Sequence, residues 1–361
     1  MRVLLNIHQT AFQNPGGGEI VVLKHYEHLR KLGADVELFD QWKTKIKLFD
    51  VVHCFGSLET RFWKEVKAQG VKLVVTPIIW PELNWKKRIG KRVARIARHV
   101  WKHPRNPFKH FTDFHVPDLL LPNSDAEAQR IMDCFGVPRS KIRVIPNGVD
   151  SRFLNSNPSI FHDRFGLNDF VLVVGRIAPV KNQLTFLKAM RGTGLQVVII
   201  GSPLSKASEY YRRCREVATE ETFFIERIEH DSDLLSSAYA AAGVLAVPSI
   251  FETCGIAALE AGLTGARIAI TKNGGTKDYF GNLVTYLDPT SEEDIRSAIL
   301  TALSKPHNGD ELREHICQNF LWEKVIRSTL QVYLEVLGHT IGSPATRLTA
   351  IDLAPIQRAT D

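Results

Sequence analysis

Short apolar runs rich in β-branched residues alternate with helix-like segments along the whole chain, and this alternation restricts the possible folds more than any other feature. Continuous apolar runs are typical of parallel strands buried on both faces. In the first half we expect strands at 3–5, 36–39, 51–54, 73–76, 119–121 and 142–145. In the second half they fall at 171–174, 197–200, 223–225, 244–247, 268–270 and 284–287. With amphipathic helices between them, these strands predict an α/β fold of two doubly wound, Rossmann-like domains.

The boundary between the two predicted domains is expected in PNGVDSRFLNSNPS, 146–159, which is rich in turn-forming residues. We therefore assign 1–147 to an N-terminal domain and 148–320 to a C-terminal domain. Ligands of doubly wound sheets bind beyond the carboxyl ends of the strands, so two such domains facing each other would enclose a cleft. The tail at 338–361 is expected to be mobile.

Composition argues against several classes of protein. The chain of 361 residues is 44% hydrophobic and 24% charged, as is usual for globular proteins. No apolar run approaches the ~20 residues that span a bilayer, and MRVLLNIHQT lacks the pattern of a secretion signal. The five cysteines are widely spaced and form no CxxC pair, so we expect a cytoplasmic protein without structural zinc.

The basic character of the chain is local. The net charge is +7, yet 83–112 alone holds ten Lys and Arg and no acid, which leaves −3 (7 minus 10) for the rest. Within it, the helix predicted at 84–103 has an apolar stripe, a basic face and tryptophans at both ends, which is typical of a helix on an anionic membrane surface. Alternatives are a helix packed on its own sheet and a patch for an anionic acceptor such as a lipid pyrophosphate. Nucleic-acid binding is disfavoured because no recognised module accompanies the charge.

Three loops after predicted strands carry residues suited to a phosphorylated ligand. NPGGGE at 14–19 would let backbone N–H groups near Gly17 and Gly18 approach a phosphate or a sugar hydroxyl, although a flexible turn explains it equally well. VVGRIAPVKNQ at 173–183 places Arg176 and Lys181 where two cations could neutralise a diphosphate. The alternative for each cation is a solvated surface charge.

The third loop is FETCGIAALEAG, 251–262, which places Glu252 after a strand and Glu260 on the next helix. Carboxylates accept hydrogen bonds from neighbouring hydroxyls of a sugar or a ribose. The N–H groups near Gly255 and Ile256, at the start of that helix, would attract phosphate. In isolation the two acids would be explained as a helix cap and a surface charge.

These motifs occur together. The pair of glutamates, with PSIF before it, NGGTKD at 273–278 after it, PNGVD and the Arg and Lys described above, resembles the retaining glycosyltransferase family 4. The resemblance extends from residue 1 to about 336. It implies the two-domain GT-B fold, with the cleft between the domains and a final helix at 321–337 that returns to the N-terminal domain.

The resemblance also implies roles for individual residues. Glu252, Arg176 and Lys181 would be catalytic, with Glu252 on the hydroxyls of the donor sugar and the two cations on its diphosphate. Glu260 would bind the ribose hydroxyls. The remaining donor contacts that it implies are Gly17, Gly18, Arg227, Ile228, Thr253, Cys254, Gly255 and Ile256, with the backbone near Arg227 and Ile228 reading the nucleobase.

The chain departs from the family pattern after the fourth strand of the first domain. Many members carry a histidine there, near the donor sugar, whereas this chain reads VVTPIIWPE at 74–82. Thr76 and Trp80 are candidates for that space. His53 matches another common position, with a packing role as the alternative.

No metal site is expected. Asp231-Ser232-Asp233 resembles a DxD metal motif, but LLSSAYAAA follows it, which favours a helix N-cap. The histidines show no HExxH or similar spacing.

The resemblance predicts a retaining, metal-independent glycosyltransferase without a cofactor. It would move a hexose, with glucose from UDP-glucose as the best guess, from a UDP- or GDP-sugar to a saccharide or lipid-linked acceptor in bacterial surface polysaccharide synthesis. We expect it in the cytoplasm or at the inner face of the membrane. The alternatives are a sugar-nucleotide 2-epimerase of the same fold and a non-catalytic binding scaffold. A nicotinamide dehydrogenase is disfavoured because GxGxxG is missing.

Overall fold

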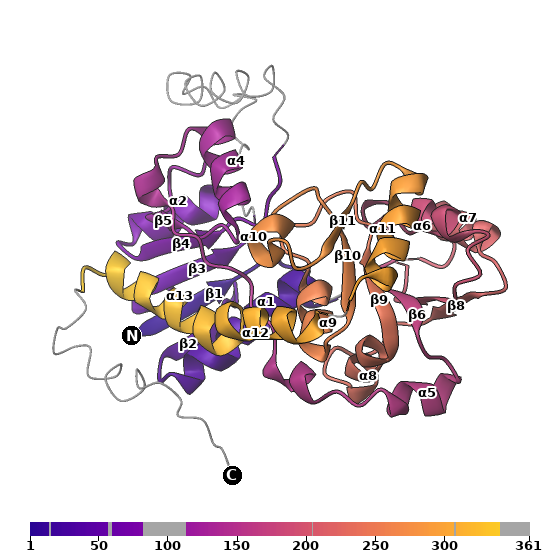
Figure 1. Ribbon diagram of the computed structural model, residues 1–361. Helices are drawn as coiled ribbons and strands as arrows, with labels where there is room; N and C mark the ends of the chain where they lie inside the picture. The colour runs from indigo at the N-terminus through magenta and orange to yellow at the C-terminus, as the bar shows by residue number, and fades with distance from the viewer. Residues whose placement is uncertain (14–15, 57–59, 82–112, 204, 307, 340–361) are drawn as a thin grey trace, which may run out of the picture. The chain divides into compact units, whose positions relative to one another are not determined.

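A computed structural model describes residues 1–13, 16–56, 60–81, 113–203, 205–306 and 308–339 (Figure 1). The chain divides into two compact units. The first comprises Met1–Pro122, Ile131–Ile145 and Ile326–Asp361, and the second comprises Asn123–Arg130 and Pro146–Val325. The predicted basic helix at 84–103 and the predicted tail from residue 340 onward lie outside the described residues.

The first unit contains a parallel five-stranded sheet with the order β2-β1-β3-β4-β5. Its strands are β1 (Arg2–Asn6), β2 (Asp35–Leu38), β3 (Val51–Phe55), β4 (Lys72–Thr76) and β5 (Leu119–Leu120). The predicted strand at 142–145 is wrong, since Ile142 makes only an isolated bridge with Leu120. Arg143 N–H donates to the Leu120 carbonyl and Ile145 N–H donates to the Pro122 carbonyl, each over 3.0 Å, but Pro122 has no N–H to donate in return, so a regular ladder does not form.

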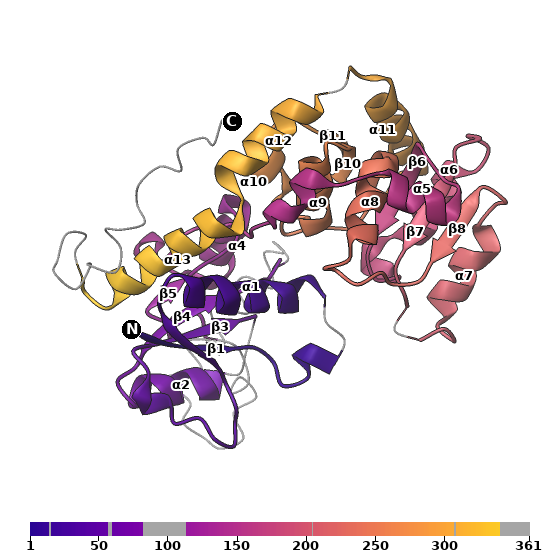
Figure 2. The same ribbon diagram turned by 90° about the horizontal axis from the view of Figure 1, so that it is seen from below.

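Helices cover both faces of this sheet. They are α1 (Gly17–Lys31), α2 (Thr60–Ala68), part of α4 (Asp125–Phe135) and most of α13 (Trp322–Val336), with short 3₁₀ turns η1 (Ala11–Gln13), η2 (Ile46–Leu48) and η3 (Arg139–Lys141). Figure 2 shows α1 and α13 on one face and α2 on the other. On α2 the buried Trp63 and Val66 supply the apolar contact with the sheet.

A buried polar cluster joins α1 and α13 to the sheet. The ring of His53, on β3, lies 2.6 Å from the Tyr333 hydroxyl of α13 and 2.8 Å from Thr76 Oγ1, measured from its two nitrogens. His25 of α1 packs edge-on against it, with ring centroids 5.6 Å apart. His53 therefore has the packing role that the sequence left open. Burial lowers the pKa of His25 to about 4 and the pKa of His53 well below its usual value.

The second unit contains a parallel six-stranded sheet with the order β11-β10-β9-β6-β7-β8. Its strands are β6 (Phe170–Val174), β7 (Val197–Ile200), β8 (Thr222–Ile225), β9 (Ala242–Val247), β10 (Arg267–Thr271) and β11 (Thr285–Leu287). Each of the six strands predicted for the second half is confirmed. The central strands β6, β7, β9 and β10 are apolar runs that are almost entirely buried, whereas β8 and β11 at the two edges are only partly buried.

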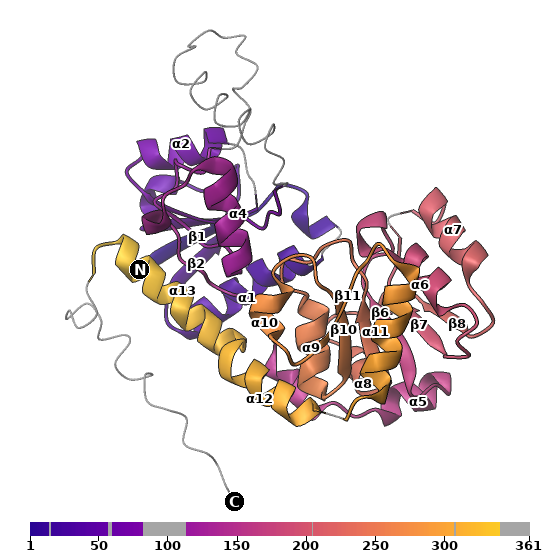
Figure 3. The ribbon, with the colours of Figure 1, turned by 45° about the horizontal axis from the view of Figure 1, so that its top comes forward.

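Two helical layers cover the second sheet. The elements are α5 (Ser159–Phe165), α6 (Gln183–Met190), α7 (Glu209–Val217), α8 (Asp233–Ala241), α9 (Ile256–Thr264), α10 (Thr276–Phe280), α11 (Glu292–Ser304) and α12 (Gly309–Asn319), with turns η4 (Ser151–Asn155) and η5 (Pro179–Lys181). Figure 3 shows α6 and α11 side by side, and their apolar residues share one core cluster. Residues of α5, α8, α9 and α12 share the other. The predicted fold class is confirmed.

Two segments depart from the predicted division at residue 147. Residues 123–130 belong to the second unit, since Tyr279 Oη donates to the carbonyl of Asn123 over 2.6 Å and Asp278 accepts from Ala126 N–H over 2.8 Å. Helix α13 begins in the second unit, where the Trp322 ring lies against Gly148, and continues in the first. No helix in the described part of the chain has the length and apolarity needed to cross a bilayer.

The buried histidines make the first unit sensitive to acid. A histidine whose pKa is lowered on folding stabilises the protein above its unfolded pKa of about 6.5, and that contribution is lost as the pH falls towards the folded value. With a folded pKa of about 4, His25 accounts for a loss of about 2 kcal/mol between pH 7.5 and pH 5. His25→Gln should therefore flatten the decline in urea-unfolding free energy over this range.

The matched control is His8→Gln, because the His8 side chain is 54% exposed. It should retain the wild-type dependence on pH. A wild-type unfolding free energy that is constant from pH 7.5 to pH 5 would contradict the assignment of His25 as a neutral buried group.

Candidate donor site

The candidate site begins where the winding of the second sheet reverses. From β6 the chain proceeds to β7 and β8 on one side and then returns to place β9 on the other side of β6. The loops that follow β6 and β9 therefore leave adjacent strand ends, which is where open α/β sheets bind ligands. Backbone contact joins the two loops, since Ile250 N–H donates to the Val180 carbonyl over 2.9 Å.

Asn182 fixes the first of these loops. It ends η5 in the left-handed conformation, with φ +58°, which asparagine tolerates better than most residues. Its buried amide donates to the carbonyls of Pro248, over 3.0 Å, and Pro289, over 2.7 Å. Since Pro248 opens the loop after β9, this amide ties the turn that carries Lys181 to the loop that carries Glu252.

Lys181 and Glu252 form an ion pair between the two loops. Lys181 Nζ lies 2.6 Å from Glu252 Oε1, and Ser249 Oγ donates to the same oxygen over 2.6 Å. The Glu252 side chain is 12% exposed and the Lys181 side chain 36% exposed, so solvent reaches the pair. Both hydrogen bonds fall on Oε1, and within the described ranges Oε2 makes none. A cation and a carboxylate oxygen are thus presented together.

The NGG sequence after β10 fixes the backbone of Glu252. Glu252 N–H donates to the Asn273 carbonyl over 3.0 Å, and Gly275 N–H donates to the Glu252 carbonyl over 2.9 Å. Gly274 has φ +122°, and a Cβ there would lie 1.7 Å from the Glu252 carbonyl oxygen. Only glycine permits this approach. The NGGTKD motif therefore holds the acidic residue in place.

Helix α9 begins directly after this loop. Gly255 is its N-cap with φ +82°, and a Cβ there would lie 2.9 Å from Ile270 Cδ1. The first helical residue is Ile256. The first backbone N–H groups of a helix have no partner within it, so this terminus offers donors and a positive dipole to an anion.

Glu260, within α9, is buried rather than on the surface, with a relative exposure of 4%. Tyr239 Oη donates to Oε2 over 2.6 Å, and His230 Nε2 lies 2.6 Å from Oε1. Burial, followed by the neighbouring Glu260, raises the pKa of Tyr239 well above its usual value, so the hydroxyl remains a donor. A buried carboxylate is tolerated because both oxygens are hydrogen-bonded.

Other predicted donor contacts around these loops differ in accessibility. Arg176 directly follows Gly175 at the end of β6 and is exposed. Thr253 is half-buried, whereas Cys254 is fully buried, and this burial raises the pKa of its thiol to about 12 against the opposing effect of hydrogen bonds with Asn147 and Tyr279. The side chain of Cys254 therefore belongs to the core, which leaves only its backbone for a ligand.

The predicted nucleobase loop follows β8. The Arg227 side chain is 41% exposed and lies 3.6 Å from Glu229, while its backbone N–H donates to Ser202 Oγ over 3.2 Å. Ile228 packs partly against the core formed by α8 and α9. The N–H of Arg227 is therefore already engaged by Ser202.

Gly17 and Gly18 belong to the first unit, at the start of α1. Glu19 Oε2 accepts from the N–H of Gly16 over 2.7 Å, and Glu19 Oε1 lies 3.2 Å from His8 Nε2. A Cβ on Gly18 would meet no described atom within 4 Å, so packing within the described structure does not require glycine at this position.

The DxD-like segment caps a helix, as predicted. Ser232 Oγ accepts from the N–H of Leu234 over 3.2 Å, and Asp233 is the first residue of α8. Within the part of the chain that the structure describes, no group of three or more His, Cys, Asp and Glu is arranged to hold a metal ion.

Sequence reasoning missed three residues around the site: Asn182, His230 and Ser249. Asn182 and Ser249 lie in the same loops as the predicted residues Lys181 and Glu252, so their position in those loops could have identified them. His230 carried none, because its partner Glu260 is 30 residues away in the sequence.

Gly274→Ala should disrupt the site and the fold together. The added Cβ would overlap the backbone of Glu252, which cannot move without breaking its hydrogen bonds to Asn273 and Gly275, so we expect destabilisation above about 4 kcal/mol. Thermal unfolding measures it. Gly281→Ala is the control, since Gly281 also has a positive φ (+50°) but open space around it, and should cost only the backbone strain of about 1–3 kcal/mol. Equal losses in the two variants would refute the close contact.

Curated relatives match part of the chain. The chain is 27% identical to D-inositol 3-phosphate glycosyltransferase 2 of Catenulispora acidiphila over 243 residues, which cover 60% of this chain and 56% of the relative. It is 29% identical to the enzyme of that name from Saccharomonospora viridis, covering 66% of this chain and 58% of the relative. The chain thus matches little more than half the length of these relatives.

Two solved structures share the fold. The sucrose-phosphate synthase of Thermosynechococcus elongatus has a TM-score of 0.72 at 17% identity, over 94% of this chain and 100% of that one. HepE of Anabaena in complex with UDP has a TM-score of 0.71 at 17% identity, over 93% and 100%.

Family models cover most of both halves of the chain. The model described as Glycosyltransferase Family 4 matches residues 40–153, and the model described as Glycosyl transferases group 1 matches residues 162–320. The second match contains β6 to β11 and therefore both loops that carry Lys181 and Glu252. Together with the two doubly wound sheets, these matches show that the chain belongs to glycosyltransferase family 4 and has the GT-B fold.

Proposed function

We propose that this protein is a retaining glycosyltransferase that transfers a hexose from a nucleotide diphosphate sugar to an acceptor hydroxyl. The observation that carries the proposal is the ion pair of Lys181 and Glu252 at the reversal point of the second sheet. It combines one group suited to phosphate with one suited to sugar hydroxyls, beside the N-terminus of α9.

Donor binding would rearrange this pair. The diphosphate would take over Lys181 Nζ, because it carries two negative charges in all, against one on the carboxylate of Glu252. Glu252, still held by Ser249, would then turn both oxygens towards the hydroxyls of the sugar. Arg176 and the first N–H groups of α9 would add further positive charge on the diphosphate.

In the transfer step, the bond from the anomeric carbon to the diphosphate oxygen breaks and a bond to the acceptor oxygen forms on the same face. The acceptor proton passes to the departing diphosphate. Lys181, Arg176 and the helix terminus would stabilise the negative charge that develops there, so the reaction would need no metal ion. Retention of the anomeric configuration is what family membership implies. No second enzymic nucleophile is apparent in the sequence.

UDP-glucose is our best candidate for the donor. The HepE fold neighbour was also solved with UDP-glucose, at a TM-score of 0.67 and 18% identity over 91% of this chain and 99% of that one. Glu260 would bind the ribose and the backbone near Ile228 the base. For the acceptor we propose a saccharide or a lipid-linked saccharide in surface polysaccharide synthesis, and the names of the curated relatives make D-inositol 3-phosphate a further acceptor to test.

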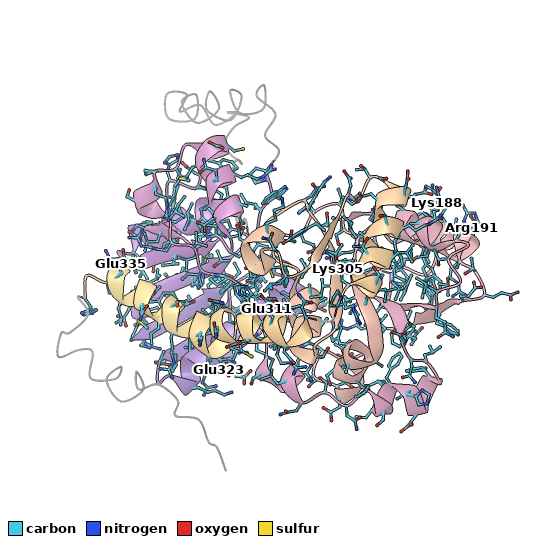
Figure 4. All side chains as sticks on the ribbon, in the orientation of Figure 1. Lys188, Arg191, Lys305, Glu311, Glu323 and Glu335 are labelled. Carbon is cyan, nitrogen blue, oxygen red and sulfur yellow. The ribbon has the colours of Figure 1, made fainter. Side chains whose placement is uncertain are left out.

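Lys181→Ala and Glu252→Ala should each reduce transfer, and hydrolysis of UDP-glucose without acceptor, by at least about 100-fold, because each removes a group that acts on the departing diphosphate or the sugar. The assay measures UDP release, and thermal unfolding verifies that the variants are folded. Lys188→Ala is the matched control, since this lysine on α6 (Figure 4) has a 42% exposed side chain and pairs only loosely with Glu292, at 3.8 Å. It should retain the wild-type rate.

Three outcomes would contradict parts of the proposal. Wild-type rates in both variants would remove these residues from the site. A wild type that neither binds nor hydrolyses any UDP- or GDP-sugar in a thermal-shift panel would refute the activity. Loss of activity in EDTA with recovery in Mg²⁺ would refute metal independence and direct attention to Asp231 and Asp233.

We also propose that 84–103 contacts an anionic membrane surface. Its basic residues would each contribute about 1 kcal/mol near such a surface. In liposome flotation, the full chain should rise with phosphatidylglycerol vesicles at low salt and be released at high salt, because salt screens the attraction. Phosphatidylcholine vesicles are the control. Failure to float with anionic vesicles at low salt would exclude this contact.

A further inference from the structure

The two groups that hold Glu260 come from separate segments of the second unit. His230 lies in the loop after β8, and Tyr239 lies within α8. His230 Nε2 is 2.6 Å from Oε1, and Tyr239 Oη is 2.6 Å from Oε2. An ionised carboxylate only accepts hydrogen bonds, so the His230 ring must carry its proton on Nε2. The orientation of Glu260 is thus determined by one donor on each oxygen.

The rings of both donors pack against Phe153 of η4, the turn that follows PNGVD. The fully buried ring of Phe153 lies 6.0 Å from the ring of His230 and 5.8 Å from the ring of Tyr239, edge-on to each. The guanidinium of Arg152 stacks 4.3 Å above the centre of the Phe153 ring and donates to the backbone carbonyl of His230. Arg152 and Phe153 thereby hold the main chain and the ring of His230.

The arrangement leaves acceptor capacity on Glu260. A carboxylate has about four lone-pair positions, two on each oxygen. Tyr239 and His230 use one position on each oxygen, and Glu260 makes no further hydrogen bond to the described residues. The remaining position on each oxygen matches a pair of neighbouring hydroxyls, such as the 2′ and 3′ hydroxyls of a ribose.

We propose that Arg152, Phe153 and His230 are positioning residues for Glu260, and that they determine how strongly the protein favours a ribonucleotide over its 2′-deoxy counterpart. The inference rests on the proposed function, in which Glu260 binds the ribose. The inference also gives the PNGVDSRF segment a role beyond marking a domain boundary. Its last two residues, Arg152 and Phe153, contact His230 in the loop after β8.

The test compares the binding of UDP and 2′-deoxy-UDP by calorimetry. His230→Ala should weaken UDP binding about tenfold, because Glu260 loses one charge-assisted hydrogen bond and its fixed orientation. Binding of 2′-deoxy-UDP should change by less than about twofold, so the discrimination falls. His230→Gln keeps an N–H donor in nearly the same place and should restore UDP binding to within about threefold of wild type. In the transfer assay, the donor KM should rise with kcat nearly unchanged.

Arg152→Gln removes the stacked charge and should reproduce the His230→Ala result, while His162→Ala, an exposed histidine of α5, should leave both affinities unchanged. If His230→Ala does not fold, Tyr239→Phe removes only the second donor and supports the same comparison. Equal losses for UDP and 2′-deoxy-UDP, or a Gln variant as weak as the Ala variant, would overturn the proposal.

Two further outcomes separate this inference from the proposed function. If wild type binds UDP but Glu260→Ala leaves the discrimination unchanged, the inference fails while donor binding stands. If wild type binds neither UDP nor GDP, the proposed function fails and the inference fails with it.

Discussion

The pairing of β6 with β9 is the interaction on which the rest of the second unit depends. Leu172 and Val171 of β6 lie opposite Leu245 and Val244 of β9, in a fully buried part of the sheet. This pairing places the ends of the two strands side by side, so the loops that follow them begin next to each other. Lys181 and Glu252 are 71 residues apart in the sequence, yet they form an ion pair because their strands are neighbours.

Hydrogen bonds to the backbone then fix the conformation of the two loops. The amide of Asn182 connects the two loops, and the Gly274–Gly275 turn holds the Glu252 backbone. Both devices use residues suited to positive φ, asparagine in one case and glycine in the other. The backbone that carries the charged side chains is therefore positioned largely by neighbouring residues of the same loops.

Sequence reasoning recovered the elements whose physics is local. The central strands of the second sheet were predictable because each is a buried apolar run, and Lys181 and Glu252 were found because they lie in the loops that follow two of these runs. The loss of a regular strand at 142–145 was not predictable. It depends on Pro122, at the end of the neighbouring segment, which has no N–H to donate to 142–145. The burial of Glu260 was also missed, because helix periodicity does not reveal that His230 and Tyr239 enclose it.

After β4, where many family members carry a histidine near the donor sugar, this chain has none. Thr76, one candidate for that space, is buried and hydrogen-bonded to His53, so its hydroxyl serves the cluster that joins α13 to the sheet. The following loop contains Ile78 with φ +49°, which is unusual for a β-branched residue. Family membership thus does not determine the local chemistry of this loop.

The distribution of cysteines has a practical consequence. All five are free, and four are buried, while Cys317 on α12 is partly exposed. A buried thiol whose pKa is raised to about 12, as at Cys254, contains almost no reactive thiolate at neutral pH. Alkylation of the four buried cysteines therefore requires local unfolding. The rate at which Cys254 is alkylated in the native protein thus measures how often the segment at the start of α9 unfolds.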